Sequence, residues 1–321
     1  MELMKRLLIL IFAGLLALSN SATAAINKEI ENRPDLADYD TAPFIDIWQG
    51  VKMPGKVSAK GAEVMKGEFG KNNQRKGFVI ENVSKPKIQF YDIKGLKDAP
   101  AMLVCPGGAY LSLQYSNEGL RVARFLNTLG IKAFILKYRV PYKMDERDPI
   151  NMDAQRAIKY IRANAKKFGV DPNRIGMIGF SAGGNLTAWM SCNFDKELYK
   201  PMDKIDAQSA RPDIACLIYP HLLNNSHKPH YAPSSEMIVR DDTPPTFIVH
   251  AQDDGVPMAS PLSYLIQLYE KKIPLDVHFF SKGGHGFSVI NTRGIPIDEW
   301  TDLLTKWLEF RGFKQKEVSN K

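Results

Sequence analysis

From about residue 88 onward, short apolar runs alternate with longer segments in which apolar residues recur at helical spacing. The apolar runs have the length of strands and occupy residues 88–91, 101–105, 133–137, 175–179, 214–219, 246–250 and 275–280. Runs that stay apolar at successive positions are typical of strands buried on both faces of a parallel sheet. The pattern predicts an α/β fold, with a doubly wound, mostly parallel sheet and helices on both faces.

Helices are predicted between these runs. Residues 118–129 carry one apolar stripe at the 3.6-residue period, formed by Leu120, Val122, Ala123, Leu126 and Leu129. Asp148 and Pro149 provide an N-cap and a first-turn proline for a second helix, which Gly169 ends. Three further helices are expected, one from about residue 185 and the others at 261–271 and 298–310.

The first 24 residues have the pattern of a signal peptide. Lys5 and Arg6 precede an apolar run at residues 7–18, and Ala22-Thr23-Ala24 is a small-residue cleavage pattern. The run is only about a dozen residues long, whereas a membrane-spanning helix needs about 20. We therefore expect cleavage before Ala25, a periplasmic or extracellular location, and no stable membrane insertion of the mature chain.

Residues 25–87 are rich in Gly, Pro, Lys and Asn and contain only short apolar islands. This composition predicts loops and short edge strands that cover one side of the domain. The sequence contains no internal repeat or low-complexity tract. We expect a single domain over residues 25–321, in which the loop-rich region at 25–87 precedes a core at 88–310.

The composition narrows the range of partners. The chain carries 43 Lys and Arg residues and a formal net charge of +8, but the basic residues are interspersed with 35 Asp and Glu. This scatter argues against a nucleic-acid partner. The three cysteines (Cys105, Cys192 and Cys216) leave at least one thiol unpaired, and no C-x-x-C or H-E-x-x-H spacing occurs. We therefore expect no disulfide framework, metal or cofactor, and we expect Cys105 and Cys216 to act as small buried hydrophobes.

The strongest chemical signal is G-F-S-A-G at residues 179–183, which follows an apolar strand and precedes a helical segment. A sharp strand-to-helix turn of this G-x-S-x-G type exposes the serine hydroxyl at the carboxyl edge of a sheet. Gly179 and Gly183 lack the side chains that would clash in such a turn. Ser181 is therefore the candidate nucleophile.

A serine hydroxyl needs a neighbouring base to remove its proton. In this architecture the acid and then the histidine follow the serine along the chain, which leaves His278 and His285 as candidates. His278 lies inside a predicted strand and is better interpreted as structural. His285 lies in a glycine-containing loop just past that strand, at the same sheet edge as Ser181, and is the candidate base.

A carboxylate must orient this histidine and stabilise its protonated form. Asp253 and Asp254 both follow the strand at 246–250, and spacing alone does not choose between them.

The oxyanion that forms during acyl transfer needs preorganised N–H donors. Gly107 and Gly108 follow the strand at 101–105 and allow a close approach of the backbone, so they are candidate donors. Ala182, directly after the nucleophile, is the third candidate.

Together these segments resemble the α/β-hydrolase superfamily, most closely its acetylxylan-esterase-like branch of carbohydrate esterases, which is related to the dienelactone hydrolases. The resemblance covers about residues 88–310. It rests on C-P-G-G-A-Y at 105–110, L-K-Y-R-V-P at 136–141, G-F-S-A-G-G at 179–184, V-H-A-Q-D-D at 249–254 and K-G-G-H-G-F at 282–287. The first of these looks like the H-G-G-G loop of esterases, with Pro106 in place of the histidine.

The resemblance also ranks the two aspartates. In such proteins the triad aspartate usually lies three residues beyond the small residue that closes its strand, here Ala251, which implies Asp254. Relatives commonly have two residues between this aspartate and a Val-Pro pair, whereas only Gly255 stands there in this chain. Counting backward from Val-Pro would select Asp253, so Asp254 is the prediction and Asp253 the alternative.

Arg139 ends a strand in the L-K-Y-R-V-P run and matches a residue characteristic of this branch. We favour a structural ion pair, because arginines at strand ends commonly brace loops. A contribution to the acyl pocket is the alternative.

The resemblance implies an exported serine carboxylesterase that removes acetyl groups from a polysaccharide or its oligosaccharides through an acyl-enzyme. The expected partner is a small ester or an acetylated saccharide. A serine peptidase is one alternative, although such enzymes usually carry a large additional domain and only about 60 ordinary residues precede this core. A non-catalytic carbohydrate-binding protein with the hydrolase fold is the other, although its function would not require the serine, histidine and acid that this chain retains.

Overall fold

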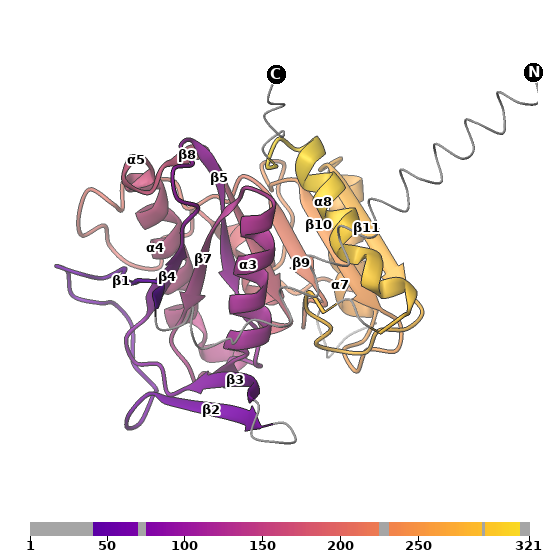
Figure 1. Ribbon diagram of the computed structural model, residues 1–321, viewed down its shortest axis with the longest axis horizontal. Helices are drawn as coiled ribbons and strands as arrows, with labels where there is room; N and C mark the ends of the chain where they lie inside the picture. The colour runs from indigo at the N-terminus through magenta and orange to yellow at the C-terminus, as the bar shows by residue number, and fades with distance from the viewer. Residues whose placement is uncertain (1–40, 70–74, 225–230, 291–292, 315–321) are drawn as a thin grey trace, which may run out of the picture.

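The computed structural model describes residues 41–69, 75–224, 231–290 and 293–314, and the predicted signal peptide lies outside them. Eight strands form the main sheet: β1 (Phe44–Asp46), β4 (Lys87–Tyr91), β5 (Ala99–Cys105), β7 (Lys132–Lys137), β8 (Val170–Phe180), β9 (Ala215–Ile218), β10 (Thr246–Ala251) and β11 (Leu275–Phe280). Their order is β1-β4-β7-β5-β8-β9-β10-β11 (Figure 1). The β1–β4 and β4–β7 pairs are antiparallel, and every pair from β7 to β11 is parallel. The doubly wound, mostly parallel sheet is therefore confirmed.

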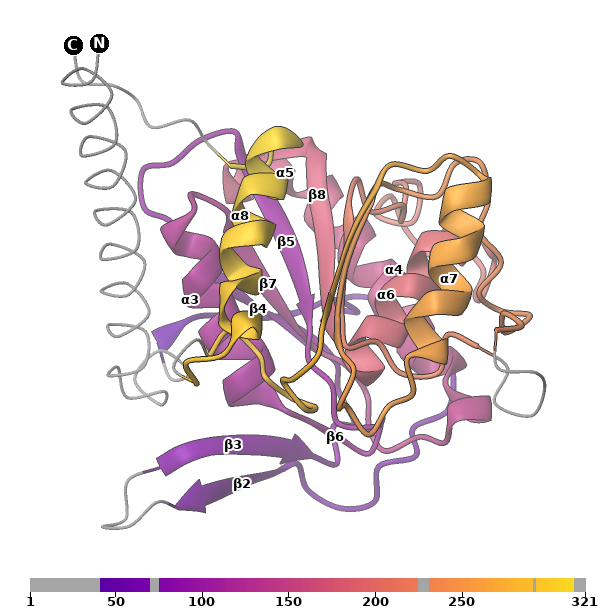
Figure 2. The same ribbon diagram turned by 90° about the vertical axis from the view of Figure 1, so that its right-hand side faces the viewer.

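Helices cover both faces of this sheet (Figure 2). On one face lie α3 (Arg121–Thr128), which continues a π-helical turn η2 (Ser116–Leu120), and α8 (Trp300–Phe310), which follows the 3₁₀ turn η4 (Pro296–Glu299). On the other lie α4 (Asp148–Ala163), α6 (Ala182–Asn193) and α7 (Ala259–Glu270). The short helices α5 (Ala165–Phe168) and η3 (Met144–Glu146) flank α4. Over the described ranges, no helix is long and apolar enough to cross a membrane.

One predicted helix start is wrong by a residue. The N-cap position of α4 is occupied by Arg147, whose side chain makes no capping hydrogen bond, and Asp148 is the first helical residue. Pro149 lies in the first turn, as predicted, where its missing N–H costs no hydrogen bond. Asp148 acts there as an acidic residue near the positive end of the helix dipole.

A second, smaller sheet lies beyond the carboxyl ends of the parallel strands (Figure 2). It joins β2 (Val64–Phe69), β3 (Arg75–Glu81) and β6 (Ser112–Leu113) in antiparallel order. Because β6 comes shortly after β5, this sheet joins the N-terminal region to the loop that leaves the centre of the main sheet. The N-terminal region therefore reaches the rim of the crevice described below.

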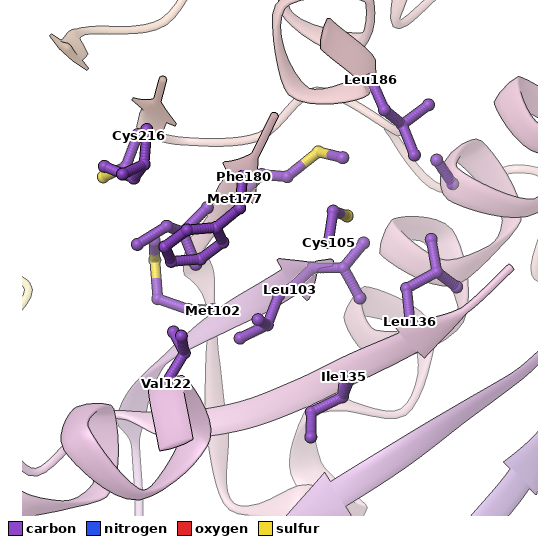
Figure 3. Close-up of a cluster of buried hydrophobic side chains, with 14 of the residues drawn as sticks. Met102, Leu103, Cys105, Val122, Ile135, Leu136, Met177, Phe180, Leu186 and Cys216 are labelled. Atoms are coloured by element: carbon purple, nitrogen blue, oxygen red, sulfur yellow. The ribbon is translucent and has the colours of Figure 1, made fainter. Parts of the chain in front are cut away.

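Buried apolar side chains form the core between the sheet and its helices, and Figure 3 shows some of them. Met102, Leu103, Met177 and Phe180 from the two central strands are fully buried there. Cys105 and Cys216 are also fully buried, and burial raises the pKa of both thiols. Their interpretation as small hydrophobes is confirmed, because a thiol that stays protonated is neither a nucleophile nor a metal ligand.

Arg139 forms a buried ion pair. Its guanidinium donates to both carboxylate oxygens of Asp153, at 2.9 and 2.8 Å, and neither side chain is exposed. It also donates to the carbonyl oxygens of Pro54 and Pro149, and Trp48 Nε1 donates to Asp153. These bonds fasten the segment that follows β1 to α4, so the ion-pair interpretation of Arg139 is confirmed.

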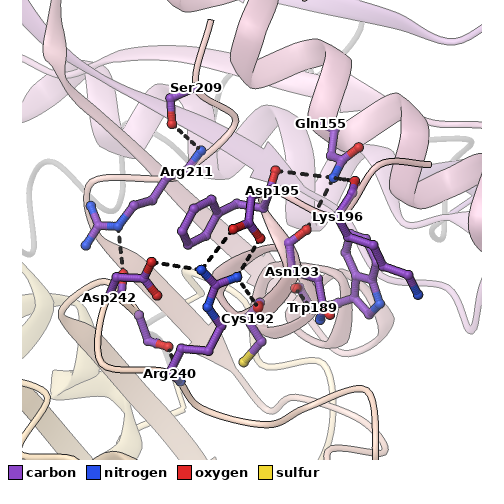
Figure 4. A network of polar contacts seen from close by, with 12 residues as sticks. Gln155, Trp189, Cys192, Asn193, Asp195, Lys196, Ser209, Arg211, Arg240 and Asp242 are labelled. Atoms are coloured by element: carbon purple, nitrogen blue, oxygen red, sulfur yellow. Dashed lines mark hydrogen bonds and ion pairs between the residues drawn. The ribbon is translucent and has the colours of Figure 1, made fainter. Parts of the chain in front are cut away.

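A second arginine braces the far end of α6 (Figure 4). Arg240 bonds Asp195 and Asp242 at 2.5 to 2.9 Å, and its guanidinium lies 4.8 Å from the centre of the Phe194 ring. The side chains in both ion pairs, Arg240–Asp195 and Arg240–Asp242, are about half exposed. Exposed ion pairs contribute only about 0–1 kcal/mol to the free energy of unfolding. Arg240 therefore links the segment after α6 to Asp242 but adds little to the stability of the fold.

Candidate active site

The strand order places two loops side by side at the carboxyl edge of the main sheet. The chain leaves β5 toward β7 on one side and returns to β8 on the other side of β5. Such a switch point opens a crevice outside the strand ends, where ligands of open α/β sheets bind. Gly107 and Gly108 follow β5, and Ser181 follows β8, so both lie at this crevice.

Ser181 sits in a strained turn between β8 and α6. Its backbone has φ 51° and ψ −116°, a conformation that residues with side chains rarely adopt. The turn is held because Ser181 N donates to Ile218 O, while its carbonyl oxygen accepts from the amides of Asn185 and His221. A Cβ at Gly183 would lie 1.9 Å from the carbonyl oxygen of Cys105, so only glycine allows β5 and α6 to approach this closely.

The structure brings the three predicted triad residues into one hydrogen-bonded chain. His285 Nε2 lies 2.8 Å from Ser181 Oγ, and His285 Nδ1 lies 2.8 Å from both carboxylate oxygens of Asp254. The Asp254 side chain is fully buried, whereas that of His285 is 38% exposed. A proton can therefore pass from the hydroxyl to an imidazole whose other nitrogen is fixed by a carboxylate.

The pKa values of His285 and Asp254 suit a base and the carboxylate that orients it. Burial alone would lower the pKa of His285, but the hydrogen bond and charge of Asp254, with the charge of Glu118, outweigh it and raise the pKa above its usual value. Burial likewise opposes ionisation of Asp254, yet the bonds from His285 and Val256 N hold its pKa below the usual value. The pair thus favours a histidine that accepts a proton readily beside an ionised aspartate.

Asp253 holds the backbone of the histidine loop. One of its carboxylate oxygens accepts from the amides of Gly283 and Gly284, at 2.8 and 2.7 Å. This carboxylate is therefore engaged with the loop backbone, whereas that of Asp254 bonds the imidazole. His278 lies on β11 with its ring against Phe247, as a structural histidine would.

Gly107 is not free to serve as an oxyanion donor, which corrects the prediction. Its N–H already donates to Glu118 Oε2 at 2.6 Å. Within the described part of the chain, the amides of Gly108 and Ala182 donate to no other group. Gly108 lines the pocket that contains Ser181, and Ala182 begins α6, so these two remain the candidate donors.

Sequence reasoning missed two residues of the site, Glu118 and Tyr219. The sequence pattern predicts Glu118 only as the start of a helical segment and Tyr219 only as the end of a strand. Both are buried, and Tyr219 Oη donates to Glu118 Oε1 at 2.9 Å while its ring packs edge-on against His285. A carboxylate at the start of an otherwise apolar helical stripe was the available signal for Glu118.

The pocket around Ser181 has a volume of about 510 Å³. Its lining includes several small or polar side chains: Ser112, Gln114, Asn117, Glu118, Ser181 and His285. The described residues contain no group of three His, Cys, Asp or Glu side chains placed to hold a metal ion. The bonded side chains of Ser181, His285 and Asp254 form an arrangement that can perform nucleophilic acyl transfer.

A doubly wound sheet with a strained serine at its switch point and an adjacent histidine and aspartate defines the class of α/β-hydrolases. Comparison with known proteins agrees. The family model described as BD-FAE matches residues 90–218. The acetyl ester-xyloside bifunctional hydrolase of Caldicellulosiruptor lactoaceticus has a similar structure, with 31% identity and a TM-score of 0.69 over 85% of this chain and 98% of that one.

Two curated relatives are similar over the core. Endo-1,4-beta-xylanase B of Butyrivibrio fibrisolvens is 31% identical over 59% of this chain and 33% of its own length. The acetylxylan esterase of Xylanibacter ruminicola is 28% identical over 65% of this chain and 45% of its own length. The chain thus spans less than half the length of each of these two relatives. These findings show that the protein belongs to the α/β-hydrolase superfamily, in its acetylxylan-esterase-like branch.

Proposed function

We propose that this protein is an exported serine carboxylesterase that removes acetyl groups from a carbohydrate. The observation that carries the proposal is the 2.8 Å contact between Ser181 Oγ and His285 Nε2, at a serine held in a strained turn and with Asp254 on the other imidazole nitrogen. An activated serine of this kind is what ester hydrolysis through an acyl-enzyme requires.

The proposed reaction has two steps. Ser181 Oγ attacks the ester carbonyl while His285 Nε2 takes its proton, and the amides of Gly108 and Ala182 stabilise the oxyanion. Collapse of this intermediate breaks the ester bond, and His285 returns the proton to the departing alcohol. Water, deprotonated by His285, then attacks the acyl-enzyme, and the carboxylic acid leaves as Ser181 recovers its proton.

The nature of the pocket and the relatives support an acetylated saccharide as substrate. Ser112 and Gln114 supply groups at the pocket wall that can bond sugar hydroxyls. The relatives include an acetylxylan esterase and an acetyl ester-xyloside hydrolase. Export would bring the enzyme to such polymers, and the signal-like pattern at residues 1–24 supports it.

The first test measures hydrolysis of p-nitrophenyl acetate by the full chain and by Ser181→Ala. We expect the variant to lose at least about 10³-fold in kcat, because the nucleophile is absent. Full activity of Ser181→Ala would overturn the proposal. Acetylated xylan, acetylated pectin and feruloylated oligosaccharide, compared at equal ester concentration, then identify the acyl group and the saccharide.

Two further measurements separate the alternatives. A fluorophosphonate probe should label Ser181 in the unmodified protein, whereas a carbohydrate-binding protein without an activated serine would stay unlabelled. Acetyl esters should be cleaved far faster than dipeptide amides, and the reverse order would favour a peptidase.

A further inference from the structure

Glu118 is a buried carboxyl group beside the site whose two oxygens hold two different loops. It lies in the π-helical turn η2 and is 4% exposed. Its Oε2 accepts from Gly107 N at 2.6 Å, and its Oε1 accepts from Tyr219 Oη at 2.9 Å. Burying a carboxyl group is costly unless its hydrogen bonds repay the loss of water. Single π-helical turns are frequent at functional sites, and the position of Glu118 in such a turn agrees with a functional role.

The bond to Gly107 orients the peptide that is expected to bind the oxyanion. Gly107 N is fixed by Glu118, and Gly107 O accepts from Gln114 N at 3.0 Å. In a trans peptide the N–H points opposite to the carbonyl oxygen, so the amide of Gly108 faces away from Gln114. Gly108 lines the pocket with Ser181. Two groups of segment 114–118 therefore fix the direction of this donor.

The bond to Tyr219 extends the same support to the histidine. The Tyr219 ring packs edge-on against His285, with 4.9 Å between ring centres. Its hydroxyl oxygen also accepts from Ser288 N at 3.3 Å, three residues beyond His285. Ser288 Oγ in turn donates to the carbonyl oxygen of Asn117, the neighbour of Glu118. The loop that carries the base is thus tied to the turn that carries Glu118.

We propose that Glu118 is a positioning residue that holds the Gly108 donor and, through Tyr219, the His285 loop in a single arrangement, so that base and oxyanion site act together. This inference rests on the proposed ester hydrolysis at Ser181. Simple packing would not require both carboxylate oxygens to face donors from two separate loops. The carboxyl group needs no contact with the substrate for this role.

The test compares Glu118→Ala, Glu118→Gln and Tyr219→Phe with the unmodified enzyme on p-nitrophenyl acetate. We expect Glu118→Ala to lower kcat by about 10²-fold with KM changed less than about twofold, since misplacing one oxyanion donor has an effect of this size. Glu118→Gln should recover most of the activity, because its amide oxygen can accept from Gly107 N and its NH₂ can donate to Tyr219 Oη. The double variant Glu118→Ala/Tyr219→Phe should be no slower than Glu118→Ala alone, because residues that act as a unit are not additive.

Ser116→Ala is the matched control for damage to the fold. Ser116 is buried in the same turn, and its hydroxyl accepts from Phe78 N of β3 at 2.8 Å rather than from Gly107 N. A loss of kcat in Glu118→Ala no larger than in Ser116→Ala, or an effect confined to KM, would overturn the proposal. If Glu118→Ala does not fold, Tyr219→Phe decides, because a several-fold fall in kcat at constant KM supports the role and unchanged kinetics contradict it.

Failure of the positioning role of Glu118 can be distinguished from failure of the proposed esterase function. If the unmodified enzyme and Ser181→Ala hydrolyse the ester equally, the esterase proposal fails before Glu118 is considered. If only Ser181→Ala is inactive and Glu118→Ala matches its control, the esterase proposal stands and the positioning role falls.

Discussion

Asp253 and Asp254 are neighbours in the chain, yet their carboxylates hold different parts of the same loop. Asp254 meets the imidazole of His285 at 2.8 Å, and Asp253 accepts from the amides of Gly283 and Gly284. One aspartate thus orients the ring, and the other shapes the backbone that presents it.

This division predicts different effects of the two isosteric substitutions. Asp254→Asn should lower kcat by about 10⁴-fold, because the amide can place the wrong histidine tautomer toward Ser181. Asp253→Asn should stay within about threefold of the original kcat, because its amide oxygen can still accept both N–H groups. Kinetics on p-nitrophenyl acetate check this, and equal losses in both variants would contradict the assignment.

The raised pKa of His285 predicts the acid limb of the pH profile. A protonated imidazole cannot accept the Ser181 proton, so kcat/KM should rise with pH as His285 loses its proton. The midpoint should lie above the usual 6.5, because Asp254 and Glu118 favour the charged form. Residual activity in Asp254→Asn should show a lower midpoint. A midpoint below 6.5 in the unmodified enzyme would be inconsistent with the described contacts.

The position of Gln114 at the pocket wall predicts that its side chain contributes to saccharide binding. Its backbone amide bonds Gly107 O, and its side chain lines the pocket. Gln114→Ala keeps the backbone bond and should raise KM for an acetylated xylo-oligosaccharide about tenfold, the cost of one lost hydrogen bond to the substrate. Hydrolysis of p-nitrophenyl acetate, which lacks a sugar, should stay within about twofold. A similar change on both substrates would argue against a saccharide contact.

The two arginine networks predict different effects on stability. Arg139→Met leaves the buried Asp153 without its cation and should lower the free energy of unfolding by about 3–5 kcal/mol. Arg240→Met removes a half-exposed pair and should cost only about 0–1 kcal/mol. Urea unfolding followed by circular dichroism measures both. Equal losses would mean that Arg139 contributes no more than a surface ion pair.

The strands and most helices could be predicted from the sequence because they depend on short-range patterns. The predicted strand at 275–280 coincides with β11, five others agree to within two residues at each end, and β8 begins five residues earlier than predicted. The second sheet is expected from the sequence only as short edge strands without defined bounds. The start of α4 differed by one residue, because capping depends on backbone geometry that residue type only biases. The chain order of Ser181, the aspartates and His285 also followed from local motifs.

Short stretches of neighbouring residues are enough to predict the class of fold, the candidate nucleophile Ser181, the candidate base His285, and the loops that carry them. The folded chain is needed to see that Gly107 N is engaged, that Asp254 bonds His285, and that Glu118 and Tyr219 belong to the site. Glu118 lies 11 residues from Gly107 and 101 from Tyr219. Contacts over such separations arise when the sheet brings several strand ends together, and no local pattern records which polar groups then meet.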